Sequence, residues 1–228
     1  MDPACAGVTG SVGLRTVSFR SRSSRFRRCL SPKSTYDVGM DQECVADESR
    51  SPTEVAYRAL ALISVVGVAL GADRVEILNW LKQHDLWQKL TPSEAEFLDT
   101  SDPSQEQIIN ASWLCERLIV IVWALGALEQ LPLPNEQCDT ASFLTILPPY
   151  APISVSDFVT SAQLRHSSIL IEMADEMLSL HWEARDAMLK GLNTSPSIDI
   201  GIIQERHHAI NWLIGYDGLD WDEVTTDT

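Results

Sequence analysis

Two long uncharged apolar runs, residues 59–72 and 118–128, constrain the fold of this chain more than any other feature. Each run would be apolar on nearly every side of a helix, which is typical of helices that are buried all round. Both are shorter than the roughly 20 residues that a membrane-crossing helix needs. We therefore expect two central core helices and no association with a membrane.

Helical spacing and helix-start signals continue along the chain from residue 53. Thr91, Pro92 and Glu94 form a capping-box pattern, and Asp102-Pro103 predicts the start of a long helix that Pro132 and Pro134 would end. No strand-like alternation of useful length occurs. The sequence predicts an all-α fold, a single bundle-like domain of about seven helices over residues 53–228. The seven main helices are expected at about 53–71, 73–84, 91–98, 103–129, from 156, 166–190 and 199–214, and a further short one is open at 139–147.

Residues 1–50 differ in composition, with an arginine- and serine-rich stretch at 18–28. Three interpretations are open: a transit-like leader, a basic arm for anionic surfaces, or translated sequence upstream of a true start at Met40. The third is favoured because Met40 opens onto the acidic body of the chain. All three predict a disordered basic leader before about residue 50.

The charge is divided unevenly between this leader and the body. The whole chain has a net charge of −15, and residues 1–39 hold seven basic and two acidic residues, so the remainder carries −20. A body this acidic repels phosphate backbones, which argues against nucleic-acid binding, and it suits a basic protein partner. The sequence does not indicate an oligomeric state.

The five cysteines show no metal-binding or disulfide pattern. No two are spaced as C-x-x-C, and three lie before residue 50. We therefore expect no structural metal, no cofactor and a reducing compartment, the cytoplasm. Cys115 lies in an apolar helical pattern, where a buried thiol is expected.

Several blocks of sequence resemble a known family. They are 58–62 (RALAL), 112–113 (SW), 122–126 (VWALG), 131–134 (LPLP), 137–139 (QCD), 181–187 (HWEARDA), 205–213 (ERHHAINWL) and 221–228 (WDEVTTDT). Over about residues 55–228 the chain is similar to an uncharacterised, mainly bacterial family, domain of unknown function 4272. The resemblance implies a compact helical domain and implies no established activity.

Polar residues that could carry chemistry concentrate near the end of the chain. His181 is on the apolar side of helix 166–190, and His207 is on the apolar side of the last helix. Neutral imidazoles ligate metals and transfer protons, but they also join satisfied hydrogen-bond networks inside bundles. Both interpretations are open for the candidate cluster His181, Glu205, Arg206, His207 and Asn211.

A buried Arg206 would need a carboxylate partner. Glu116, Asp186 and Asp222 are the candidates. The expected structural residues, which supply burial, are Trp123, Trp212 and Trp221, and the acidic tail should dock through Trp221 and Val224.

Two functional hypotheses follow from the sequence. The favoured one is a protein-interaction module, because the body is acidic and no G-x-S-x-G, phosphate-binding glycine loop or catalytic-cysteine pattern occurs. The alternative is a small-ligand-binding or enzymatic domain with a polar pocket around His181, Arg206 and His207, of which a metal site would be a variant. Catalytic residues are not assigned under either hypothesis.

Overall fold

The two apolar runs form neighbouring central helices, α1 (Pro52–Ala69) and α4 (Gln105–Ala124), in the computed structural model. This structure describes residues 49–192 and 198–227, and the predicted leader lies outside them. The described part contains seven α-helices and three short 3-10 helices without a strand, which confirms the all-α prediction. The remaining helices are α2 (Arg74–Gln83), α3 (Pro92–Asp99), α5 (Val155–Thr160), α6 (Ser167–Leu189) and α7 (Ile200–Leu213), with 3-10 turns at Trp87–Lys89, Thr140–Thr145 and Tyr216–Gly218.

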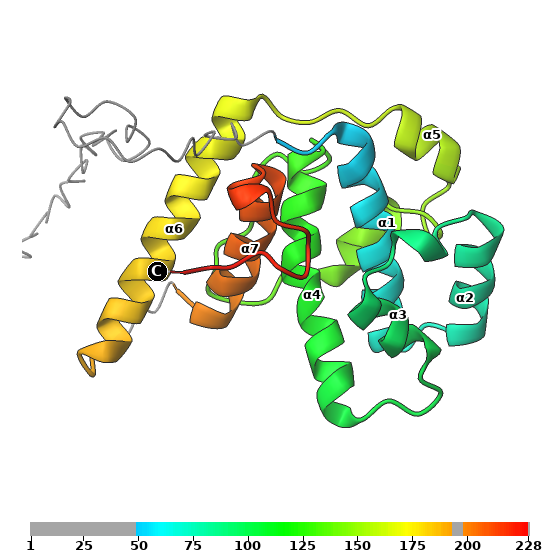
Figure 1. The fold of residues 1–228 in the computed structure, drawn as a ribbon, viewed down its shortest axis with the longest axis horizontal. Coiled ribbons are helices and arrows are strands. Elements are labelled where there is room, and N and C mark those ends of the chain that lie inside the picture. The colour runs from blue at the N-terminus through cyan, green and yellow to red at the C-terminus, as the bar shows by residue number, and fades with distance from the viewer. Residues whose placement is uncertain (1–48, 193–197, 228) are drawn as a thin grey trace, which may run out of the picture. The chain divides into compact units, whose positions relative to one another are not determined.

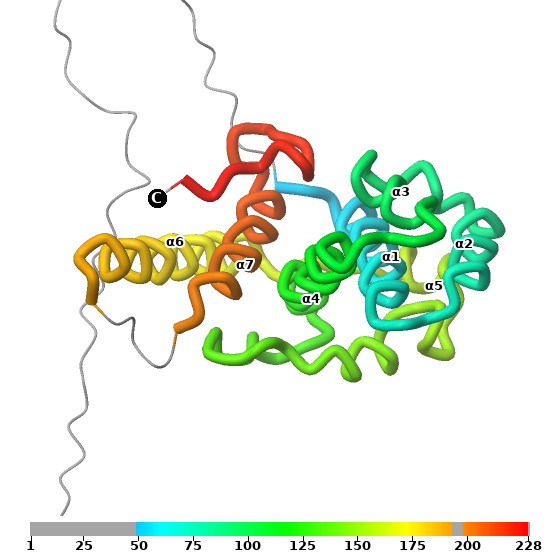
Figure 2. Tube along the Cα trace, turned by 90° about the horizontal axis from the view of Figure 1, so that it is seen from below, coloured from blue at the N-terminus to red at the C-terminus, as the bar shows by residue number. Residues whose placement is uncertain are grey.

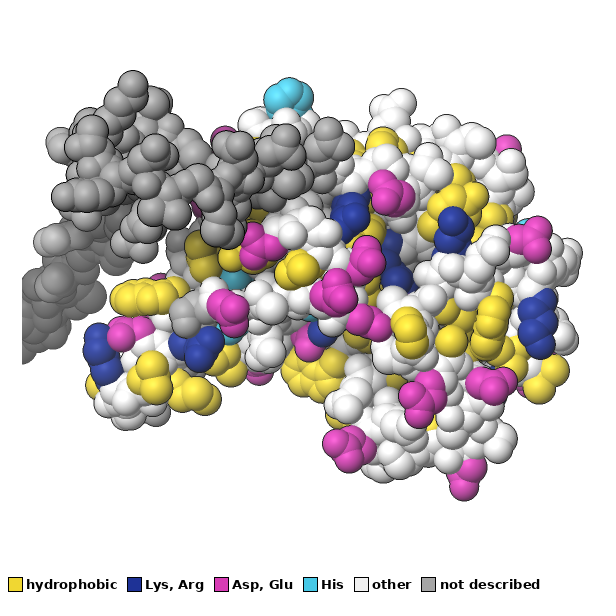
Figure 3. Space-filling model, in the orientation of Figure 1, with side chains coloured by type: hydrophobic (Ala, Val, Ile, Leu, Met, Phe, Trp, Pro, Cys, Tyr) yellow, Lys and Arg dark blue, Asp and Glu magenta, His cyan; other side chains and the backbone are white. Residues whose placement is uncertain are grey.

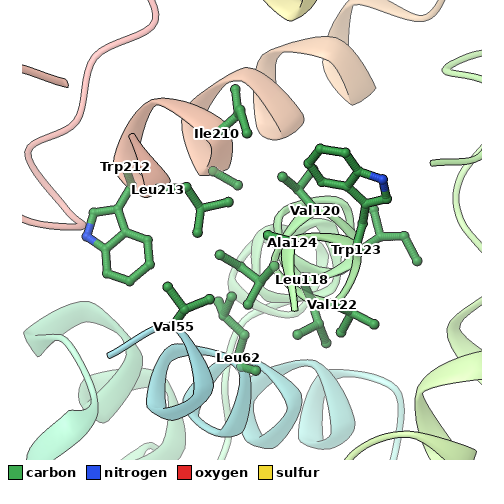
Figure 4. Packing of buried hydrophobic residues seen from close by; sticks show 14 of the residues in the cluster. Val55, Leu62, Leu118, Val120, Val122, Trp123, Ala124, Ile210, Trp212 and Leu213 are labelled. Atoms are coloured by element: carbon green, nitrogen blue, oxygen red, sulfur yellow. The ribbon is translucent and has the colours of Figure 1, made fainter. Parts of the chain in front are cut away.

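The helices are arranged around α4 (Figures 1 and 2). Helix α1 packs along one side of α4, and α7 packs along another. Helix α6 lies outside α7, while α2, α3 and α5 surround α1. Figure 4 shows Val55 and Leu62 of α1, Leu118 of α4 and Leu213 of α7 meeting between the three helices, and all four side chains are fully buried.

Helices α1 and α4 are each long and apolar enough to cross a membrane by length and composition alone. In the folded chain, however, 67% of the apolar window of α1 and 56% of that of α4 are buried against other parts of the protein. The two runs therefore serve as core helices in this structure, as their all-round apolar pattern predicted.

Capping residues set the starts of the helices. Ser51 with Glu54, Thr91 with Glu94, and Ser104 with Gln107 form complete capping boxes, in which two backbone N–H groups are satisfied at each start. The predicted start of α4 was two residues early, because Ser104 and not Asp102 is its N-cap.

The predicted end of α4 at residue 129 was wrong. The helix ends at Ala124, because Gly126 adopts a left-handed φ of 78° that glycine accepts without strain. The chain before α6 then covers this end. The Arg165 backbone N–H donates to the Ala124 carbonyl at 2.9 Å, and its side chain donates to the Trp123 carbonyl at 2.8 Å.

The C-terminal tail turns back over the end of α7 (Figure 1). Trp221 and Val224 are buried, and Asn211 of α7 donates to the Thr225 carbonyl at 3.0 Å. The rings of Trp212 and Trp221 meet edge to face with centroids 5.1 Å apart. Trp123, Trp212 and Trp221 are all at least nine-tenths buried, so each supplies apolar contact to the core.

Candidate functional site

The two predicted histidines lie together at the interface of α6 and α7. Nδ1 of His181 is 3.0 Å from Nδ1 of His207, and both side chains are almost fully buried. One of these nitrogens must donate a hydrogen and the other accept it, so the two Nδ1 atoms are not both protonated. Burial lowers the pKa of His181, and burial with the neighbouring His181 lowers the pKa of His207 to about 4.

This pair makes the fold sensitive to acid. In the unfolded chain His207 takes up a proton below about pH 6.5, whereas in the folded protein it does so only near pH 4. The free energy of unfolding should therefore be highest above pH 6.5 and fall by about 1.4 kcal/mol per pH unit down to about pH 4 for this histidine. Urea denaturation at pH 7 and pH 5 tests this. His207→Asn is expected to reduce the difference in the free energy of unfolding between the two pH values. Equal stability at both values would contradict it.

Arg206 is paired with Glu116, one of the three predicted partners. Both side chains are almost completely buried, and the guanidinium contacts Glu116 Oε2 at 2.9 Å through Nε and 2.8 Å through its second amino nitrogen. The other amino group donates to the Pro132 carbonyl at 2.5 Å. Oε1 of Glu116 accepts from the backbone N–H of Cys138 at 2.6 Å. This ion pair fixes α7 to α4 and to the loop that contains Pro132 and Cys138.

Glu116 also belongs to a group that has the composition of a metal site. Its carboxylate and the Cys115 and Cys138 thiols lie within 4.8 Å of one another, and all three residues are buried. The Cys138 thiol donates to the Cys115 carbonyl at 3.5 Å, and its hydrogen bonding to Cys115 together with burial raises its pKa. Because the Arg206 guanidinium already neutralises the carboxylate, the arrangement fits a structural ion pair better than a cation site.

Four clefts in residues 49–192 and 198–227 can be compared with the pocket that was expected around His181, Arg206 and His207. None of these clefts is lined by any of the three residues, and Asn211 lines none of them either. Only Glu205 of the predicted cluster reaches a cleft. His181, Arg206 and His207 are instead bonded to protein groups.

The largest of these four clefts, of about 650 Å³, is formed by α3, α4, α7 and the tail. Four acidic residues and a single arginine line it, with amides and two indoles between them. Figure 3 shows acidic side chains gathered around a few basic ones at the centre of this face. A second cleft, of about 540 Å³, shares Ser93, Arg117, Gln204 and Asp222 with the first, so the two are continuous. The lining residues that bear on function are Glu94, Glu96, Arg117, Glu205, Asp222, Gln107, Asn110, Gln204, Trp113 and Trp221.

Arg117 is the only cation in the lining of the largest cleft, and it is already paired. It forms an ion pair with Glu205, and its amino group donates to Nε2 of His208 at 3.1 Å. Nε2 must therefore be unprotonated, and burial followed by the nearby Arg117 lowers the pKa of His208 to about 3. The guanidinium also lies 5.9 Å from the Trp221 ring centroid. These contacts join α4, α7 and the tail.

A second ion pair, between Arg58 of α1 and Glu94 of α3, forms the wall behind Trp221. Both residues are buried, and the Arg58 guanidinium lies 4.9 Å from the Trp221 ring centroid. Oε2 of Glu94 also accepts from the Thr91 backbone N–H at 2.9 Å, so one carboxylate both caps α3 and holds it to α1.

Sequence reasoning did not identify Arg58, Glu94, Trp113 or Arg117 as part of a site. A usable signal existed for the arginines, since Arg58 and Arg117 are lone cations in apolar stretches of helix, where a carboxylate partner is required. Glu94 was assigned only its capping role. Trp113 belongs to a block that resembles the family, but nothing local places it at a cleft.

These features define an all-helical domain whose helices are tied by buried ion pairs beside an acidic cleft. Residues 30–224 match the protein family described as Domain of unknown function (DUF4272), and the chain belongs to this family. The match begins upstream of the sequence blocks on which the resemblance rested. Neither the comparison with curated proteins nor that with solved structures gave a match.

Proposed function

We propose that this domain is a protein-interaction module that binds a positively charged segment of a partner in the cleft between α3, α4, α7 and the tail. The observation that carries the proposal is the lining of this cleft, which has four carboxylates against one arginine. Opposite charge at a concave surface attracts and orients a partner.

Internal pairing leaves part of this negative charge available. Glu94 and Glu205 are neutralised by Arg58 and Arg117. Glu96 and Asp222 are exposed at the rim, and no ion pair within the described residues involves either of them. Two unpaired carboxylates at the mouth of a cleft suit lysine or arginine side chains of a bound segment.

The floor of the cleft supports a peptide rather than a single ion. Trp113 is half-buried and packs over Gly201, where an added Cβ would lie 3.3 Å from its ring. An indole face attracts a cationic side chain. The amides of Gln107, Asn110 and Gln204 can donate to and accept from a peptide backbone. The alternative, a ligand or enzymatic pocket around His181, Arg206 and His207, gains no support from these four clefts of the described residues, because none of them is lined by these three side chains.

Binding of fluorescein-labelled octa-arginine to the full chain tests the proposal by anisotropy. Glu96→Lys with Asp222→Lys should weaken binding about tenfold or more, since like charges then face each other. Glu129→Lys with Glu136→Lys is the matched control. It changes the net charge by the same amount as the cleft variant, at exposed positions that line none of the four clefts. This control should keep most of the affinity, and wild-type affinity should fall with added salt. Equal losses in both double variants would show attraction to the whole body and overturn the cleft as the site.

A further inference from the structure

The lining of the acidic cleft includes apolar side chains as well as carboxylates. Val65 of α1, Phe97 of α3 and Leu114 of α4 all line it, and the first two are at least nine-tenths buried. These side chains offer no hydrogen bond to a cation that loses its water on entering the cleft. They suit the aliphatic stem of a long basic side chain whose charged end lies against polar groups.

Trp113 of α4 supplies an aromatic surface to the same cleft. It is half-buried, and Gly201 in the first turn of α7 lies against its ring. A Cβ at position 201 would lie 3.3 Å and 3.5 Å from two ring atoms and 3.2 Å from Oδ1 of Asp199. Glycine weakens a helix relative to alanine, and here its place is explained by the room that the indole needs. The ring is thus held by α7, while part of it stays exposed in the cleft.

Glu94 contributes a carboxylate oxygen that has no donor. Its Oε2 accepts from Arg58 and from the Thr91 backbone N–H, whereas its buried Oε1 accepts no hydrogen bond from the described part of the chain. Glu94 is 4% exposed and lines the cleft. Buried polar atoms without a partner are rare in folded proteins, so this oxygen marks a position for a donor that the described residues do not supply.

We propose that this cleft selects arginine over lysine in the segment that it binds, and that the selection depends on Trp113. The inference rests on the proposed function, because it names which basic side chain the acidic cleft takes. A guanidinium is planar and stacks on an indole, and its five N–H donors can serve an exposed carboxylate as well as an inner oxygen such as Oε1 of Glu94. An ammonium is compact and strongly hydrated, so it loses more when apolar side chains replace its water.

The contact with the indole sets the size of the expected selectivity. A cation over an indole strengthens binding by about two- to thirtyfold, from exposed to desolvated sites, and arginine uses this contact more often than lysine does. Trp113 is half-buried, between these limits. We therefore expect octa-arginine to bind about tenfold more tightly than octa-lysine, which has the same length and charge.

Anisotropy titrations of the full chain with both labelled peptides, at one salt concentration, measure the ratio of the two dissociation constants. In Trp113→Leu this ratio should fall from about tenfold to about twofold, while Trp113→Tyr keeps an aromatic face and should retain most of it. Trp182→Leu is the matched control. It removes an indole of α6 that is 58% exposed and lines none of the four clefts, so the ratio should stay as in the wild type. Circular dichroism checks the helix content of each variant.

A wild-type ratio near one would overturn the selection of arginine, and this measurement needs no variant to fold. An unchanged ratio in Trp113→Leu would overturn the role of the indole. Failure of the proposed function looks different. If Glu96→Lys with Asp222→Lys weakens both peptides while the wild type binds both alike, the acidic cleft stands and only the selection falls. If that double variant weakens neither peptide, the cleft is not the site and both proposals fall.

Discussion

Replacing Glu116 by alanine is expected to lower the free energy of unfolding by about 3–5 kcal/mol. The change leaves the Arg206 guanidinium buried without its carboxylate, and it removes the acceptor of the Cys138 backbone N–H. Both losses fall at the junction of α7, α4 and the loop from Pro132 to Cys138. Urea denaturation followed by circular dichroism at pH 7 measures the effect.

A double variant separates the value of the pair from the cost of an unpaired charge. Glu116→Leu with Arg206→Met removes both charges and keeps much of the volume, so it should be less destabilising than either single change. Destabilisation of Glu116→Ala by less than about 1 kcal/mol would show that Arg206 finds another partner or water, and would contradict the role assigned to this pair.

Replacing Trp221 by alanine is expected to cost about 3–5 kcal/mol, the range for truncating a buried tryptophan. Its ring contacts Trp212 at 5.1 Å and His208 at 5.0 Å between centroids, and the Arg58 guanidinium lies over it. The Arg117 guanidinium lies 5.9 Å from the same ring centroid, so Trp221 joins the tail to both internal ion pairs beside the cleft. Trp221→Phe keeps an aromatic ring and should cost clearly less.

Hydrogen exchange identifies where this loss acts. In Trp221→Ala the amides of the tail, residues 215–227, should exchange much faster than in the wild type. The amides in the centre of α4 should still exchange only through global unfolding of the domain. Unchanged protection of the tail would mean that Val224 and the Asn211 hydrogen bond hold it without the indole.

The helices of this fold were largely predictable because their signals are local. Ser51, Thr91 and Ser104 mark helix starts through hydrogen bonds made within three residues. The apolar runs of α1 and α4 are buried as their composition requires. The ends were harder, since α4 ends at Ala124, just before Gly126, and Arg165 covers that end from 41 residues further along the chain.

The candidate site was less predictable because it depends on contacts between distant segments. The sequence indicated that Arg206 needs a carboxylate, but only the packing of α7 on α4 selects Glu116 over Asp186 and Asp222. The acidic cleft exists because the tail returns beside α3 and brings Asp222 to Ser93. No spacing within the sequence encodes that approach.

Helix α6 illustrates a different limit of pattern analysis. Helical spacing puts Met188 on the same side as His181, seven residues earlier, but Met188 is 62% exposed, because it lies beyond Ala184, the last buried residue of the helix. The exposed Ile171, Leu178 and Trp182 each follow a buried residue by one position, so the apolar side of this helix is wider than its buried side.

The most direct test of the functional account compares two variants in one titration with octa-arginine. Glu96→Lys with Asp222→Lys alters the acidic cleft, whereas His181→Gln alters the buried histidine pair and leaves the cleft lining intact. At pH 7 the account predicts that the first variant loses about tenfold or more in affinity and that the second binds as the wild type does. Loss of binding in His181→Gln while the lysine variant still binds would contradict it.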